Sequence, residues 1–143
     1  MKILACTDGS EQSYKALEEA AKIANRVKGD VTVIHVEEPI PHPNEWGYYF
    51  SEDSLKQYEE RREKEREEIM ATAARIFNEL NVQFNKIIRK GHPAETISKE
   101  AAEGGFDMIV MGNRGLGGLK EKLLGSVSNA VVQQADVSVV IVK

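Results

Sequence analysis

The sequence predicts an α/β domain: a doubly wound parallel sheet with helices on both faces. Short apolar segments rich in β-branched residues alternate along the chain with longer segments of helical periodicity. The apolar segments are nearly continuous, which is typical of strands covered by helices on both sides. No repeat, linker or low-complexity tract divides the 143 residues. Residues 1–143 are therefore expected to form a single domain.

Five segments are expected to be strands, and helices are expected between them. The strands are predicted at residues 1–6, 31–36, 82–88, 108–111 and 137–142. Residues 7–10 are expected to supply the turn and the N-cap before the first helix, and Gly29 to end it as a left-handed residue. Pro93 should open the third helix, Gly104 and Gly105 should end it, and the last helix should begin near Ser126.

The second helix is unusual in its length and charge. It is expected from Ser51 to about Leu80, a length of about 45 Å at 1.5 Å per residue, which exceeds what a small sheet can cover. Residues 59–68 include no apolar side chain. This stretch is interpreted as a solvated face with acid-base pairs, and a charged partner surface is the alternative.

The loop before this helix combines prolines with an aromatic cluster. The aromatic residues are Trp46, Tyr48, Tyr49 and Phe50. They either pin the loop to its own domain or form a lid or contact surface.

Composition argues against several function classes. The net charge of -4 gives the chain no general attraction to nucleic acid or to an acidic membrane surface. No apolar run approaches the roughly 20 residues that span a bilayer, so no membrane association is expected. The single cysteine, Cys6, cannot form an internal disulfide, and no secretory signal is recognisable. A cytoplasmic location is therefore expected.

Ligands of doubly wound sheets bind beyond the carboxyl ends of the strands, where the winding direction reverses. Two segments qualify: residues 7–9 after the first strand, and residues 112–115 after the fourth. If these two strands are neighbours, both segments line one crevice.

The segment after the fourth strand is suited to phosphate. Gly112 and Gly115 let backbone N–H groups approach an anion without a Cβ in the way. Gly125 precedes a helix whose free N–H groups and dipole favour anions, and Ser126 and Ser128 add hydroxyl donors. A flexible connection that binds nothing is the alternative, because loops this rich in glycine also occur as plain connections. The chain has no Gly-Lys-Ser/Thr sequence of a P-loop, and the Rossmann glycine spacing is missing after the first strand.

Charged residues could complete the site. Arg114, Lys120 and Lys122 are candidate phosphate cations. Asp8 could bind ribose hydroxyls, hold Mg²⁺ through water, or simply cap the first helix. The histidines lack metal-ligand spacing, so no metal-binding residue is predicted; Cys6 is expected to be a small buried hydrophobe, and no catalytic residue is identified.

The pattern Gly112-x2-Gly115-x9-Gly125-Ser126 resembles the nucleotide-binding signature of the universal stress protein family. The opening run at residues 3–10, His35-Val36 and residues 107–112 also resemble that family, in its order along the whole chain. The resemblance implies a flavodoxin-like sheet of strand order 3-2-1-4-5. It also implies an adenine nucleotide, expected to be ATP with Mg²⁺, in the crevice between strands 1 and 4.

The resemblance further implies roles for individual residues. Thr7 and Asp8 would lie beside the nucleoside, and Val36 would contact adenine through its backbone. Met111 and Gly112 would lie near the ribose. The residues around the phosphates would be Arg114, Gly115, Gly125, Ser126 and Val127, with Ser128 as a further candidate.

The family commonly forms homodimers through its last strand, here Val137 to Val142, although a loop of the same chain could cover that edge instead. The predicted function is that of an ATP-binding stress-response or signalling protein. One alternative is a slow ATPase centred on Asp8 and a metal. The other is a nucleotide-independent interaction protein that works through the charged helix and the aromatic loop.

Overall fold

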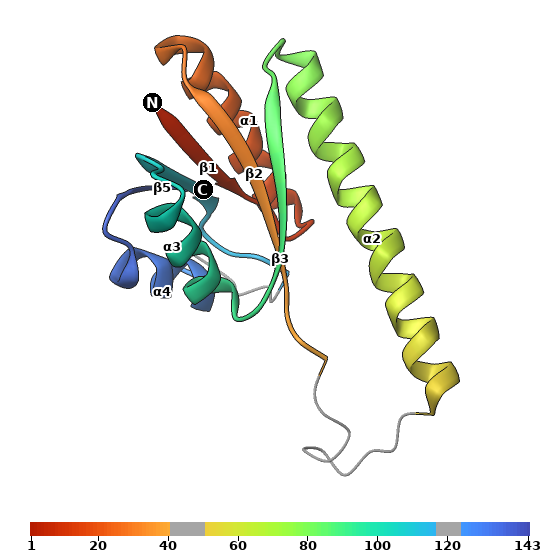
Figure 1. Ribbon diagram of the computed structural model, residues 1–143. Coiled ribbons are helices and arrows are strands. Elements are labelled where there is room, and N and C mark those ends of the chain that lie inside the picture. Colours follow the sequence, from red (N-terminus) through yellow and green to blue (C-terminus); the bar gives the residue numbers. More distant parts are fainter. Residues whose placement is uncertain (41–50, 117–123) are drawn as a thin grey trace.

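The computed structural model describes residues 1–40, 51–116 and 124–143, and in them strands and helices alternate as predicted (Figure 1). The strands are β1 (Lys2–Cys6), β2 (Asp30–Glu37), β3 (Phe84–Lys90), β4 (Met108–Gly112) and β5 (Ser138–Val142). The helices are α1 (Glu11–Val27), α2 (Glu52–Glu79), α3 (Pro93–Glu103) and α4 (Ser126–Gln134).

The five strands form one sheet in the order β3-β2-β1-β4-β5, and every neighbouring pair is parallel. The predicted topology is therefore confirmed. β1 is central: the chain winds outward through β2 to β3 and then returns to β4 on the other side. The winding direction reverses between β1 and β4, where Ile3 is paired with Met108 and Ala5 with Val110.

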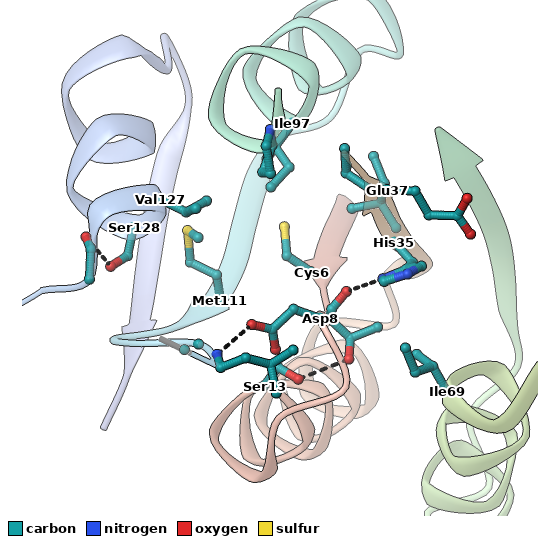
Figure 2. A pocket seen from close by; sticks show the side chains of 18 of the residues that line it. Cys6, Asp8, Ser13, His35, Glu37, Ile69, Ile97, Met111, Val127 and Ser128 are labelled. Atoms are coloured by element: carbon teal, nitrogen blue, oxygen red, sulfur yellow. Dashed lines mark hydrogen bonds between the residues drawn. The ribbon is translucent and has the colours of Figure 1, made fainter. Parts of the chain in front are cut away.

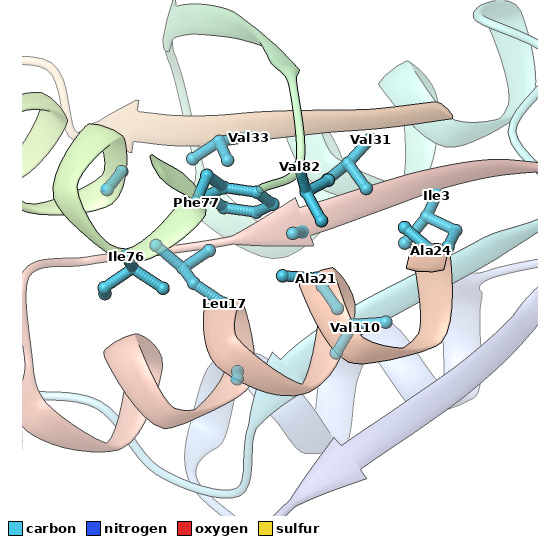
Figure 3. Close-up of a cluster of buried hydrophobic side chains, with 14 of the residues drawn as sticks. Ile3, Leu17, Ala21, Ala24, Val31, Val33, Ile76, Phe77, Val82 and Val110 are labelled. Atoms are coloured by element: carbon cyan, nitrogen blue, oxygen red, sulfur yellow. The ribbon is translucent and has the colours of Figure 1, made fainter. Parts of the chain in front are cut away.

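Helices cover both faces of this sheet because successive β1 side chains point to opposite sides. Ile3 and Ala5 join the core under α1 and α2, whereas Leu4 and Cys6 join the core under α3 and α4. Figure 3 shows the first core, in which α1 and α2 pack side by side on the sheet. Its large, fully buried side chains include Ile3, Leu17, Val31, Val33, Phe77 and Val110.

The end of α1 differs from the prediction. The left-handed residue is Lys28, with φ of 52°, and not Gly29. Gly29 instead lies against the start of β1, where an added Cβ would stand 2.9 Å from the carbonyl oxygen of Met1. The glycine is therefore needed for a close approach between chain segments.

The third strand lies later than predicted, at Phe84–Lys90. Asn81 takes a left-handed conformation after α2, and the N–H of Val82 donates to the carbonyl of Phe77 at 2.9 Å. Val82 is therefore part of the turn that closes α2, although its side chain is buried in the core as an apolar strand residue would be.

Helix α2 is as long as predicted, and Ser51 caps it by accepting the N–H of Ser54 at 3.2 Å. Its carboxyl-terminal half packs on the sheet through Met70, Ala73 and Phe77. Its amino-terminal half extends past the carboxyl-terminal edge of the sheet (Figure 1). The predicted aromatic cluster at residues 46–50 lies outside the described residues. Of the helices described, none combines the length and apolar character needed to cross a membrane.

Phe77 is the largest fully buried side chain of the core, and its ring stacks on Phe84 with centroids 4.7 Å apart. We expect Phe77→Ala to lower the free energy of unfolding by about 3–5 kcal/mol, because it leaves a cavity between α2 and the sheet. Denaturant unfolding measures this. Val132→Ala, at a side chain that is 45% exposed, is the control and should cost less than about 1 kcal/mol. Equal losses in both variants would contradict this account of the core.

Candidate functional site

A cleft of about 690 Å³ lies at the carboxyl ends of β1, β2 and β4 (Figure 2). All eleven residues that the sequence indicated as binding residues line it, although they come from four separate stretches of the chain. They are Thr7, Asp8, Val36, Met111, Gly112, Arg114, Gly115, Gly125, Ser126, Val127 and Ser128. The pairing of β1 with β4 brings the first of these stretches beside the third, residues 111–115.

The turn after β1 is fixed by hydrogen bonds around Thr7. Its Oγ1 lies 2.9 Å from the hydroxyl of Ser13 and accepts the N–H of Gly9 at 3.2 Å. Ser10 caps α1, because its Oγ accepts the N–H of Ser13 at 3.1 Å. The interpretation of Asp8 as the helix cap is therefore wrong, and its carboxylate is left for another role.

Asp8 joins the two predicted binding segments. One carboxylate oxygen accepts the N–H of Ser10 at 3.0 Å, and the other accepts the N–H of Leu116 at 3.0 Å. The second oxygen also lies against Gly115, where an added Cβ would overlap it. A side chain at this position would force the Asp8 carboxylate to shift, and an anion that used the Leu116 N–H would have to displace the carboxylate.

The amino terminus of α4 presents free N–H groups to the cleft. Gly125 is its N-cap and supplies no side-chain hydrogen bond, so the N–H groups of Ser126 and Val127 have no partner within the helix. An added Cβ on Gly125 would lie 3.2 Å from the Cα of Arg114, so this glycine also permits a close approach. Such a helix end attracts anions through these donors and through its dipole.

Ser128 has a different geometry from the one expected of a phosphate donor. Its hydroxyl is buried and donates to the carbonyl of Asn113 at 2.8 Å. The N–H of Gly125 donates to the same carbonyl at 2.6 Å. Ser128 therefore ties α4 to the segment after β4 in the described conformation. The candidate cations Lys120 and Lys122 lie outside the described residues.

Two reactive residue types border the cleft, and both have structural explanations. Burial raises the pKa of the Cys6 thiol to about 12, so this side chain is a neutral thiol and a weak nucleophile at neutral pH. His35 places Nδ1 2.9 Å from the carbonyl oxygen of Thr7, which can only accept, so Nδ1 carries the hydrogen. Across residues 1–40, 51–116 and 124–143, no group of three or more His, Cys, Asp or Glu side chains could hold a metal ion.

The sequence interpretation missed one wall of the cleft, which is formed by α2 through Arg62, Glu65 and Ile69. Residues 59–68 were expected to be a solvated face, but Arg62 and Arg66 are half-buried. These arginines are four residues apart and continue the inward stripe of Ile69 and Ala73. That spacing was a usable signal, although it is invisible when only apolar residues are counted.

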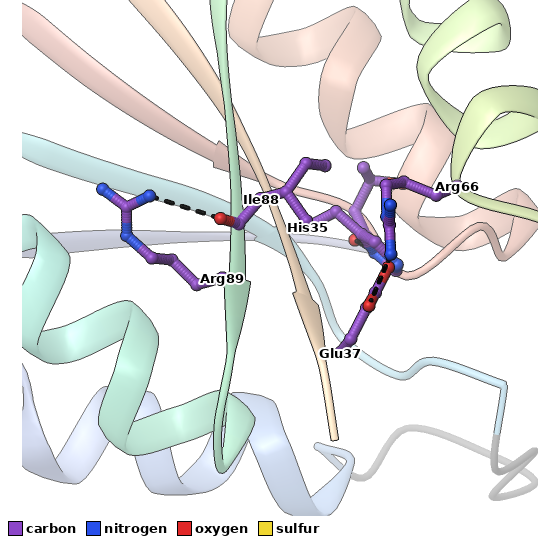
Figure 4. Close-up of polar contacts among 6 residues, drawn as sticks. His35, Glu37, Arg66, Ile88 and Arg89 are labelled. Atoms are coloured by element: carbon purple, nitrogen blue, oxygen red, sulfur yellow. Dashed lines mark hydrogen bonds and ion pairs between the residues drawn. The ribbon is translucent and has the colours of Figure 1, made fainter. Parts of the chain in front are cut away.

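Arg66 and Glu37 fasten this wall to the sheet (Figure 4). The guanidinium of Arg66 donates from Nε to Oε1 of Glu37 at 2.5 Å and from Nη2 to Oε2 at 3.0 Å. The Glu37 side chain is only 3% exposed. The hydrogen bond from Arg66 is the main cause that lowers the pKa of Glu37 below its ordinary value of 4.5. The pair is therefore charged at neutral pH.

The family model described as the universal stress protein family matches residues 1–143. The chain belongs to this family. It is 35% identical to universal stress protein YxiE of Bacillus subtilis, over 99% of this chain and 98% of that protein. It is 36% identical to a universal stress protein of Thermus aquaticus, over 99% of this chain and 97% of the relative.

Solved structures, several of them named universal stress proteins, have the same fold. Hypothetical protein MJ0577 superposes with a TM-score of 0.82 at 30% identity, over 99% of this chain and 94% of that one. A universal stress protein solved in complex with cAMP gives a TM-score of 0.72 at 22% identity, over 100% and 96% of the two chains. One from Archaeoglobus fulgidus, in complex with dAMP, gives 0.70 at 20% identity, over 100% and 98%. The flavodoxin-like fold implied by the resemblance is thereby confirmed.

The ion pair of Glu37 and Arg66 predicts a specific pH dependence. Glu37→Gln should lower the free energy of unfolding by about 1–3 kcal/mol at pH 7, because Arg66 then lacks its charged partner. In the wild type this stabilisation is present above the unfolded pKa of Glu37, near 4.5, and is lost as the pH falls through the lower folded pKa. The difference between wild type and variant should therefore shrink on acidification, which urea unfolding from pH 7 to pH 3 measures.

Glu19→Gln is the control, since Glu19 forms an exposed pair with Lys22 at 2.9 Å. It should change the free energy of unfolding by about 0.5 kcal/mol or less at pH 7. A loss in Glu37→Gln that stays constant across the pH range would show that the charge of Glu37 does not stabilise the fold.

Proposed function

We propose that this chain binds an adenine nucleotide, ATP with Mg²⁺, in the cleft between β1 and β4, and that it acts as a nucleotide-dependent stress-response or signalling protein. One observation carries the proposal: four separate stretches of the chain meet at a cleft whose glycines leave room for close approach. The family relatives solved with cAMP and dAMP support an adenine nucleotide as the ligand class.

The two ends of the cleft differ in chemistry, which suggests how the ligand lies. The end near Val36 is bordered by the apolar side chains of Cys6, Pro93 and Ile97, which suit a purine ring. The other end has the free N–H groups at the start of α4, which suit phosphate. We infer that the base lies at the β2 end and the phosphates at the α4 end.

The charges around the cleft favour a nucleotide that carries a divalent cation. The described side chains that line it include the carboxylates of Asp8, Glu38 and Glu65 and the guanidiniums of Arg62 and Arg114, in addition to Glu37, which Arg66 neutralises. Polyphosphate alone would add to this negative charge. Mg²⁺ prefers oxygen ligands and phosphates together. Asp8 could hold the ion, because its carboxylate lies against Gly115 in the glycine segment, residues 112–115.

Binding, and not catalysis, is the activity that we propose. Rapid hydrolysis needs a group that positions and activates water. The Cys6 thiol, which borders the cleft, stays protonated at neutral pH and cannot serve as that group. The slow-ATPase alternative would depend on Asp8 and the metal, so its turnover should be lost in Asp8→Ala.

Gly115→Val tests the site directly, because its side chain would displace the Asp8 carboxylate from its described position and fill the space beside the cleft. Mass spectrometry of freshly purified, denatured protein identifies any nucleotide already bound, and calorimetry measures ATP with Mg²⁺. We expect the wild type to bind and Gly115→Val to bind at least about tenfold more weakly, a difference of about 1.4 kcal/mol. An unchanged unfolding transition in the variant separates lost binding from lost folding.

The matched control is Gly105→Asn, which lies before the amino end of β4 and does not line the cleft. Gly105 has φ of +66° and an open environment, and asparagine tolerates this conformation. This variant should bind ATP like the wild type. The proposal would be abandoned if the wild type carried no nucleotide and gave neither heat nor a thermal shift at millimolar ATP with Mg²⁺.

We also propose that two copies of the chain associate through the edge strand β5. β5 is the last strand of the sheet, and its side chains from Val139 to Val142 are only partly buried. An apolar edge strand of this kind favours pairing with another chain. Light scattering at micromolar protein should therefore give a molar mass twice the 15.9 kDa of one chain. A mass of one chain at all concentrations would contradict the dimer.

A further inference from the structure

The inward-facing side chains of helix α2 change from apolar to charged where the helix passes the carboxyl-terminal edge of the sheet. Its inward stripe is apolar and buried at Met70, Ala73 and Phe77. One and two turns earlier, the stripe is continued by Arg66 and Arg62, which are half-buried. A charged group in such a position needs a partner or a ligand, because removing it from water costs free energy.

The two arginines differ in their partners. Arg66 is held by both carboxylate oxygens of Glu37. Arg62 borders the cleft, and its guanidinium lies over the ring of Tyr58, 5.2 Å from the centroid. In the described parts of the chain, no carboxylate lies within 4.0 Å of its nitrogen atoms. Its charge is therefore left facing the cleft region without an ionic partner among these residues.

Arg62 lies at the β2 end of the cleft. Glu37 directly follows Val36, and Arg62 is one helical turn from Arg66, the residue that Glu37 holds. Arg62 is also close enough to Glu37 for its positive charge to add to the effect of the Arg66 hydrogen bond in lowering the pKa of that carboxyl. The glycine segment and the start of α4 belong to the other wall (Figure 2).

We propose that Arg62 is a base-binding residue, whose planar guanidinium stacks on the purine of the nucleotide in the cleft. The inference rests on the proposed function and adds a contact from α2, an element outside the glycine signature. A guanidinium is planar and weakly hydrated, so it stacks on aromatic faces better than an ammonium group does. Tyr58 supports the opposite side of such a stack by holding the guanidinium over its ring.

The test compares adenosine, AMP and ATP with Mg²⁺ by calorimetry on four proteins: wild type, Arg62→Gln, Arg62→Lys and Arg61→Gln. Arg61 is the matched control because it is the neighbouring residue on the same helix, carries the same charge and is exposed. We expect Arg62→Gln to weaken all three ligands by a similar factor, about three- to thirtyfold. Arg62→Lys should be nearly as weak, and Arg61→Gln should match the wild type. The unfolding midpoint of each protein is measured alongside.

The outcomes separate this inference from the function on which it rests. A wild type that binds none of the three ligands would overturn both. If the wild type binds and Arg62→Gln binds equally well, only the inference fails. A loss confined to AMP and ATP, or full affinity in Arg62→Lys, would also overturn it, since either result would show that Arg62 acts by charge alone.

Discussion

The parallel pairing of β1 with β4 is the constraint on which the site depends. It places the turn after Cys6 beside the segment after Met111, although more than a hundred residues separate them in the chain. Both strands are buried on both faces, so their register is fixed by two cores. The carboxyl ends of the two strands therefore lie side by side in one register, and this register fixes where the following loops begin. The position of the cleft is therefore determined by the order of the strands, and the loop sequences determine only its lining.

Much of this arrangement is encoded locally and was predictable. Alternating apolar and amphipathic segments specify the doubly wound class, and the Gly115 and Gly125 spacing marks the loop that must accept close neighbours. What could not be predicted depends on contacts between distant residues. Gly29 is required because the carbonyl oxygen of Met1 lies too close for a β-carbon, and Lys28 adopts the left-handed conformation that the glycine was expected to take. The local sequence around Gly29 contains no information about its contact with Met1.

In helix α2, too, a contact between distant residues could not be predicted from the local sequence. A stretch without apolar residues is interpreted as solvated, yet its inward positions are occupied by Arg62 and Arg66. Arginine suits both environments, because its stem packs against apolar surface while its guanidinium forms directed hydrogen bonds. The partner that reveals this role is Glu37, which lies on another element and is itself hidden at the end of a strand. Only folding brings the charges of Glu37 and Arg66 together, and this ion pair holds α2 against the sheet, where it forms one wall of the cleft.

The Asp8 carboxylate links the occupancy of the cleft to the conformation of its glycine segment. In the described conformation it accepts the N–H of Leu116, and its oxygen fills the space beside Gly115. A phosphate that approached the same N–H would meet a like charge, so the two anions compete unless a cation lies between them. Under the proposed function, Asp8 would hold the Mg²⁺, whose charge would offset this repulsion. The Asp8 carboxylate thus fixes the described conformation of the segment after β4 from the other side of the β1–β4 junction.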